Sequence, residues 1–336
     1  MKRITIVLSL VFLVVLVVSC GDSVATTSDL TSNTVVTTSS IDVTSSSDVT
    51  TSVELTSTDE VTTSDDVTTS SEVTTTPDIV TSAPPITEDP YSQGLLFALN
   101  EDKTGYVLLG MGSCTDSDLL IPPTYEELPV CQIADSAFSE NQTLSSVVIP
   151  DSVGAIGENV FEKCTSLTSV TLPNRLKTIS IAAFQNCSKL TDITIPDGVT
   201  MIASNAFENC TSLTELTLPD SVSGIGSSVF KGCVNLTSME IPQRVTTLGI
   251  GAFQGCQSLE RITIPSGLQY INSEAFSGCS ALTSITLPKS VTYIGSRAFS
   301  GCKKLTIRCE VLTAPNGWSG TWNISNCKVE WGVTVP

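Results

Sequence analysis

The chain has 336 residues, of which 34 are acidic and 16 are basic, so its net charge is −18, and it contains no histidine. The missing histidine excludes Ser–His and Cys–His nucleophile pairs and the HExxH zinc site. The acidic balance argues against a nucleic-acid-binding surface. Neither a P-loop nor a G-x-G-x-x-G motif occurs, so we expect no enzyme, no cofactor and no nucleic acid partner.

A predicted secretory signal opens the chain. Lys2 and Arg3 precede an apolar run over residues 4–18, which is shorter than the ~20 residues that a membrane-spanning helix needs. We therefore predict a signal peptide at residues 1–19. The small residues before Cys20 resemble a bacterial lipoprotein signal, which implies that Cys20 carries a lipid and ties the chain to a membrane. An uncleaved N-terminal anchor is the alternative, and both readings place the remainder outside the cytoplasm.

Residues 20–90 have a different composition, and we interpret them as the lipid attachment site followed by a stalk. About half of them are Ser or Thr, and from residue 21 to residue 90 there are 13 acidic residues and no Lys or Arg. Such a segment buries too little apolar surface to offset its chain entropy, and its like charges repel one another. We expect a disordered, extended acidic stalk.

A hairpin is predicted next, within an N-terminal cap at residues 91–118. Apolar residues alternate over residues 95–109 on both sides of a polar turn at residues 100–105. A cap is needed because a terminal coil would otherwise leave its apolar face and its strand edge in water. Residues 309–336, with Trp318, Trp322 and Trp331, are expected to cap the other end.

Phenylalanine recurs every 23 residues between the two caps. Such a period marks a solenoid, in which one coil cannot bury its apolar face alone. We predict a β-rich solenoid of 23-residue coils over residues 119–308. The phenylalanines are Phe138, Phe161, Phe184, Phe207, Phe230, Phe253, Phe276 and Phe299, and the last seven are followed three residues later by Cys164, Cys187, Cys210, Cys233, Cys256, Cys279 and Cys302.

One coil, residues 282–304, shows how the period builds a core. Leu282, Ile285 and Leu287 fit the leucine-rich pattern L-x-x-L-x-L, and the residues between them point outward as in a half-buried strand. Pro288 ends the strand. Gly295 is expected to allow a bend with positive φ. Stacked coils would then form a parallel sheet on one side, with short helical turns elsewhere in the coil.

The chain has 12 cysteines. The seven that follow the period share one inward position, so we expect reduced thiols packed as small apolar groups, although disulfides between neighbouring coils are geometrically possible. A 23-residue interval is not the spacing of metal ligands, so no metal is expected. Cys309 and Cys327 bracket the Trp-rich loop and are expected to form a disulfide. Cys114 and Cys131, which bracket the N-terminal cap, are considered as a second.

The exposed face of the parallel sheet is the candidate ligand-binding face. It lacks Trp and Tyr anchors, so we expect weak affinity at each site that many copies on one surface would raise. Its outward residues are Ser169, Thr171, Asp192, Thr194, Glu215, Thr217, Ser238, Glu240, Arg261, Thr263, Ser284 and Thr286.

Three other interpretations of this face are open. Threonine is favoured on half-exposed strands whatever the function, so a solvated face without a ligand is one alternative. Glu215, Glu240 and Glu260 could supply a catalytic carboxylate pair, but a solvated sheet face accounts for them. Regular threonines could bind ice, although Glu240 and Arg261 interrupt the rows.

The unit from Leu282 through Cys302 resembles the BspA-like, or Treponema-type, leucine-rich repeat, and the tryptophan-rich segment after Cys309 resembles the C-terminal cap of its bacterial members. The resemblance covers about residues 119–336. It implies an exported or surface-anchored protein without catalytic residues, and several members act as adhesins. The expected partners are a membrane, through the lipid on Cys20, and extracellular matrix proteins or the proteins or glycans of host-cell or bacterial surfaces. A structural surface coat without a specific ligand is the alternative.

Overall fold

The structure, a computed structural model, describes residues 7–9, 13–15 and 89–334. The chain divides into two compact units, Met1–Val80 and Thr81–Pro336. In the first unit, β1 (Val7–Ser9) and β2 (Leu13–Val15) pair antiparallel within the apolar run at the start of the chain. Cys20 and nearly all of the predicted stalk lie outside the described residues.

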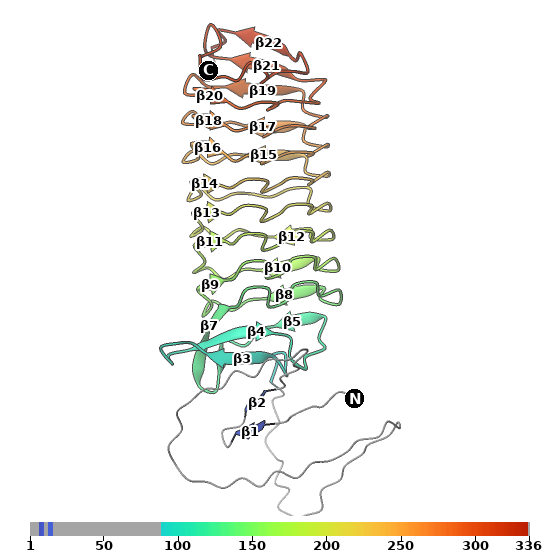
Figure 1. Ribbon diagram of the computed structural model, residues 1–336, viewed down its shortest axis with the longest axis vertical. Helices are drawn as coiled ribbons and strands as arrows, with labels where there is room; N and C mark the ends of the chain where they lie inside the picture. Colours follow the sequence, from blue (N-terminus) through green and yellow to red (C-terminus); the bar gives the residue numbers. More distant parts are fainter. Residues whose placement is uncertain (1–6, 10–12, 16–88, 335–336) are drawn as a thin grey trace, which may run out of the picture. The chain divides into compact units, whose positions relative to one another are not determined.

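The second unit is a stack of coils that carries short parallel strands on two sides (Figure 1). We call the broader side the major face. Its strands are β5 (Asp118–Leu120), β8 (Ser146–Val148), β10 (Ser169–Thr171), β12 (Asp192–Ile193), β15 (Ser238–Glu240), β17 (Arg261–Thr263), β19 (Ser284–Leu287), β21 (Thr306–Cys309) and β22 (Lys328–Trp331).

The other side, the minor face, is one continuous six-stranded sheet. The sequence predicted a sheet on one side only, and the second sheet arises because Val and Ile after each proline turn also point inward. Its strands are β11 (Thr178–Ile179), β13 (Met201–Ile202), β14 (Gly224–Ile225), β16 (Thr247–Leu248), β18 (Tyr270–Ile271) and β20 (Tyr293–Ile294).

Adjacent coils are held in register one period apart. Ser146 pairs with Ser169 on the major face, and Tyr270 pairs with Tyr293 on the minor face. Along a major-face strand such as β10 the middle residue is buried and its neighbours are half-buried or exposed. The 23-residue period therefore places equivalent side chains directly above one another, as a solenoid of leucine-rich repeats requires.

The eight phenylalanines form a single stack through the core. Neighbouring ring centroids lie 5.2–5.8 Å apart, and the ring planes differ by 6–20°. All eight side chains are almost completely buried. Rings of this size supply much of the apolar area that holds each coil to the next.

The expected short helical turns are absent, because none of the described residues is assigned to a helix. Consequently no membrane-spanning helix is found among them. The turns before and after each phenylalanine instead contain two residues with positive φ, such as Asn159 and Lys163, which interrupt a right-handed helix. Their backbone N–H groups donate to the next coil, as Lys163 does to the carbonyl of Gln185 at 2.7 Å.

The expectation that Gly295 adopts positive φ is also wrong. Neither Gly295 nor its equivalents Gly226 and Gly249 are among the residues with positive φ. These glycines serve close stacking instead, because a Cβ atom on Gly295 would lie 2.3 Å from the backbone nitrogen of Ser273 in the preceding coil.

Both ends of the stack are closed. At the N-terminal end, β3 (Leu96–Leu99) and β4 (Tyr106–Gly110) form an antiparallel hairpin, and β4 pairs parallel with β7 (Leu128–Ile133). The same sheet includes β6 (Thr124–Tyr125) and β9 (Ala155–Ile156), both paired with β7. At the C-terminal end, β21 and β22 extend the major face.

Tryptophans complete the C-terminal closure. The ring of Trp322 meets the last phenylalanine, Phe299, edge-on, with centroids 6.0 Å apart and an interplanar angle of 82°. Trp318 is buried, and its indole N–H donates to the carbonyl oxygen of Val291 at 3.2 Å. The phenylalanine stack therefore ends on an aromatic ring and is not exposed to water.

Candidate binding face

The structure places all twelve predicted ligand-face residues on the solvent side of the major face. Ser169, Ser238 and Thr286 are half-buried. The others are exposed, namely Thr171, Asp192, Thr194, Glu215, Thr217, Glu240, Arg261, Thr263 and Ser284. They form two columns that run along the stack, because equivalent residues of neighbouring coils are paired in register.

The sequence predicted one continuous parallel sheet on this side, but the major face is interrupted. It divides into the sheets β5–β8–β10–β12, β15–β17 and β19–β21–β22. Between β12 and β15 one coil contributes no strand to the major face, and residues 215–218 pair with neither neighbour among the described residues. The coil is joined to the next by the backbone N–H of Thr237, which donates to the carbonyl oxygen of Thr214 at 3.0 Å.

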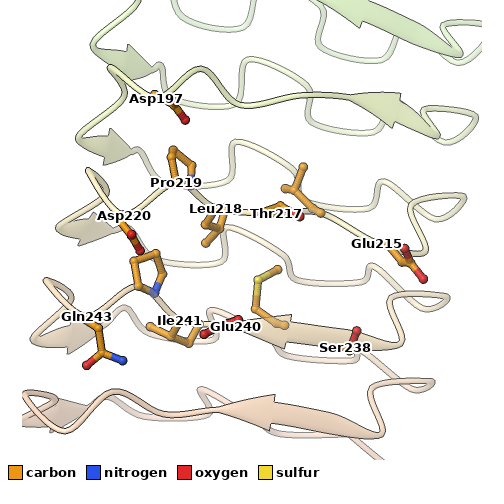
Figure 2. Close-up of a pocket in the computed structure, with 13 residues that line it drawn as sticks. Asp197, Glu215, Thr217, Leu218, Pro219, Asp220, Ser238, Glu240, Ile241 and Gln243 are labelled. Atoms are coloured by element: carbon orange, nitrogen blue, oxygen red, sulfur yellow. The ribbon is translucent and has the colours of Figure 1, made fainter.

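This interruption coincides with a hollow of about 540 Å³. Figure 2 shows Glu215 and Ser238 at one end of the hollow and Asp220 and Gln243 at the other. Its polar lining includes four carboxylates and no basic side chain. The carboxylates are those of Asp197, Glu215, Asp220 and Glu240, and all four residues are exposed.

Like charges give a physical reason for the interruption. Asp192 and Glu215 occupy the same column position in successive coils, where most other coils carry Ser. In a paired ladder their carboxylates would lie side by side, and like charges directly opposite one another destabilise strand pairing. A second hollow, of about 410 Å³, lies at the break between β17 and β19 and is lined by Arg261 and Glu310 among others. No like-charge pair explains that second break.

Elsewhere on the major face, acidic side chains are held by hydrogen bonds. Asp118 accepts hydrogen bonds from the hydroxyls of Ser146 at 2.6 Å and Ser145 at 3.1 Å, and these bonds lower the pKa of its carboxyl group. At the other end, Lys328 lies 2.7 Å from Glu330 and lowers the pKa of that carboxyl group. The carboxylates around the hollow between β12 and β15 have no salt-bridge partner in the described part of the chain.

The cysteines of the period form a ladder of buried thiols. Each S–H donates to the carbonyl oxygen of the phenylalanine in the preceding coil, at 3.0–3.2 Å. Burial raises the pKa of Cys164 and of Cys233 to about 12. A high pKa leaves the thiol protonated and unreactive, as expected for a structural cysteine.

Neither predicted disulfide is formed in the structure, where all eleven described cysteines are free. The S–H of Cys327 donates to the carbonyl oxygen of Cys302 at 3.2 Å. The Cys327 sulfur also lies 4.0 Å from the carbonyl oxygen of Phe299, which is the acceptor that the ladder pattern would give it. Cys131 of the other pair donates to the carbonyl oxygen of Tyr106 at 3.4 Å. The 23-residue period did not predict that Cys327 extends the row of buried thiols, because Cys327 follows Cys302 by 25 residues and not by 23.

Of the three predicted catalytic carboxylates, Glu215 and Glu240 line the same hollow, and Glu260 lines the second hollow. Glu215, Glu240 and Glu260 are all exposed on or beside the major face. Within residues 7–9, 13–15 and 89–334, no group of three or more His, Cys, Asp or Glu residues could hold a metal ion.

Comparison with known proteins agrees with this architecture. Residues 131–257 and 177–306 match the model of the BspA type leucine-rich repeat region, in six copies. A leucine-rich repeat protein from Bacteroides ovatus with a known crystal structure is 26% identical, with a TM-score of 0.54, and the match covers 71% of this chain and 70% of that chain.

A second solved structure is also similar. The leucine-rich repeat protein of T. pallidum is 29% identical over 63% of this chain and 88% of its own, with a TM-score of 0.47. No curated protein matches this sequence.

Proposed function

Because this chain belongs to the BspA-type leucine-rich repeat family, we propose that it is a lipid-anchored bacterial surface protein that mediates adhesion or recognises proteins or glycans through its major face. Solenoids of this type generally serve as binding scaffolds, because stacking equivalent coils creates an extended rigid surface. The proposed partners are extracellular matrix proteins and the proteins or glycans of host-cell or bacterial surfaces.

The observation that carries this proposal is the acidic hollow in the middle of the major face. Four exposed carboxylates line it, no Lys or Arg is among the lining residues, and none of the four forms a salt bridge in the described part of the chain. A basic segment of a protein would complement this charge. Exposed carboxylates contribute little energy one at a time, and many copies on one surface would raise the overall strength of attachment.

A binding screen tests the proposal. The full chain carrying Cys20→Ala, which keeps it in solution, is displayed in many copies on beads and exposed to an array of matrix proteins and surface glycans. We expect saturable binding to at least one member. Glu215→Lys should weaken binding by about tenfold, because it reverses a charge at the acidic hollow. Arg261→Glu reverses a charge at the second hollow and should change binding without reproducing that loss, because it makes the face more acidic.

Glu101→Lys is the matched control, since Glu101 is exposed in the turn of the N-terminal hairpin and its reversal changes the net charge by the same amount as Glu215→Lys. Unchanged binding by that control would confine the effect to the major face. If no array member binds above beads without protein, the chain is better described as a structural surface coat.

Lipid anchoring rests on Cys20 and is tested separately. Cells that produce the full chain are grown with an alkyne-tagged fatty acid, and the protein is examined for label and for its presence in the membrane fraction. We expect the wild-type chain to be labelled, whereas Cys20→Ala should lose both the label and membrane retention. If the Cys20→Ala chain carries no label but stays in the membrane fraction, the chain has an uncleaved N-terminal anchor.

A further inference from the structure

Two exposed tyrosines lie side by side on the minor face, near the C-terminal end of the stack. Tyr270 on β18 is paired in register with Tyr293 on β20, so both side chains leave the sheet in the same direction. They are 45% and 37% exposed, and their ring centroids lie 6.2 Å apart at an interplanar angle of 45°. The repeat pattern did not predict this pair, because it predicted a sheet on the major side of the coil only.

Small residues flank the pair along the stack and leave the ring faces open. On one side Tyr270 is paired with Thr247. On the other side Ile294 bridges to Trp318, which places Gly317 next to Tyr293. A side chain at Gly317 would meet the carbonyl oxygen of Thr292 at 2.4 Å, so this position cannot readily carry a group that would cover the Tyr293 ring.

The outward positions next to the two tyrosines along their own strands and on the paired strand β16 carry polar, uncharged residues. The outward residues beside them are Thr246, Thr247, Gln269 and Thr292, which offer hydroxyl and amide groups. This environment differs from that of the major face, where carboxylates dominate the hollow. The minor sheet is also unbroken from β11 to β20, so the rings are held on a rigid support.

We propose that Tyr270 and Tyr293 form a binding site for a neutral glycan. One face of a pyranose ring is lined with C–H groups and complements the electron-rich face of an aromatic ring, while the sugar hydroxyls can bond to hydroxyl and amide groups beside it. A sulfated or carboxylated polymer would need basic side chains, which these outward positions lack. A folded protein partner would need a contact area of about 800 Å² on each side, far more than two rings supply.

This inference goes beyond the proposed role of the major face, because it concerns the opposite sheet and a ligand without charge. Either site could exist without the other. The two are separated experimentally by variants that each alter one face only, since Glu215 lies on the major face and the tyrosines lie on the minor face.

Affinity electrophoresis in native gels tests the site. The full chain carrying Cys20→Ala is run through gels that contain dextran, a β-1,3-glucan or mannan, with heparin and chondroitin sulfate as charged comparisons. We expect at least one neutral polysaccharide to retard the protein. Tyr270→Ala combined with Tyr293→Ala should weaken this binding by about tenfold or more, because aromatic anchors carry much of the energy of such contacts.

Three further variants make the result decisive. Tyr270→Phe combined with Tyr293→Phe should retain most of the binding, since the rings remain. Met201→Ala, which alters another exposed side chain of the minor face, should have no effect, and neither should Glu215→Lys. The melting temperature of each variant is measured first. We expect it to equal that of the wild type, because every substitution is at an exposed position.

The proposal is overturned if no neutral polysaccharide retards the protein, if only the charged polymers do, or if the double alanine variant binds as well as the wild type. Loss of binding through Glu215→Lys instead would assign the glycan to the major face, supporting the proposed function and refuting this inference.

Discussion

At the residue scale, each coil depends on one phenylalanine that stacks on its counterparts above and below. The ring centroid of Phe230 lies 5.8 Å from that of Phe207 and 5.2 Å from that of Phe253, and the side chain is fully buried. Phe230→Ala should lower the free energy of unfolding by about 3–5 kcal/mol, measured by urea denaturation, because it leaves a cavity in the core. Ile250→Ala, at a residue that is 55% exposed, should cost less than about 0.5 kcal/mol. Equal losses would refute the stacking account.

Two of the buried thiols, Cys164 and Cys233, make stability depend on pH in one direction. Because burial raises the pKa of Cys164 and Cys233 from 9.0 to about 12, the folded chain keeps protons that the unfolded chain releases above pH 9. Their contribution to stability is therefore complete below pH 9 and declines as the pH rises toward 12. We expect the urea midpoint to fall between about pH 8 and about pH 10, and to fall less steeply in the Cys164→Ala, Cys233→Ala double variant. Identical slopes would contradict this role of the thiols.

At the element scale, the missing strand between β12 and β15 is attributed to the neighbouring carboxylates of Asp192 and Glu215. Glu215→Ser removes the repulsion and restores the residue found at this position in most other coils. We expect residues 215–218 to pair with their neighbours and their amide hydrogens to exchange more slowly, as hydrogen-exchange mass spectrometry would record. Thr217→Ser, in the same coil, leaves both carboxylates in place and should change nothing. Unchanged exchange in Glu215→Ser would mean that charge does not cause the break.

The repeated core could be predicted from sequence because burial repeats with the coil. The 23-residue interval identifies Phe230 and Cys233 as inward residues without knowledge of any contact. The break in the major face depends instead on which side chains meet between coils, and the tyrosine pair belongs to a sheet that the pattern did not reveal. The helical turns were predicted wrongly because positive φ at residues such as Asn159 and Lys163 is a property of the stacked backbone.

At the scale of the whole molecule, each coil is supported only by its neighbours, so the ends of the stack are its weakest part. Trp322 covers the exposed side of Phe299. Trp322→Ala should therefore loosen the last coils, with about tenfold faster amide exchange over residues 293–302. Exchange around Phe230, in the middle of the stack, should be unaffected. Equal acceleration in both places would show that the stack unfolds as one unit and that the cap does not act locally.

The most direct test of recognition by the major face is attachment under flow. Beads that display the full chain at equal density are perfused over the ligand identified by the screen, and the fraction that remains attached is counted. Glu215→Lys should lose most of its attachment, whereas Glu101→Lys, which changes the net charge by the same amount in the exposed turn of the N-terminal hairpin, should attach like the wild type. Equal attachment by all three, with equal melting temperatures, would contradict a binding role for this face.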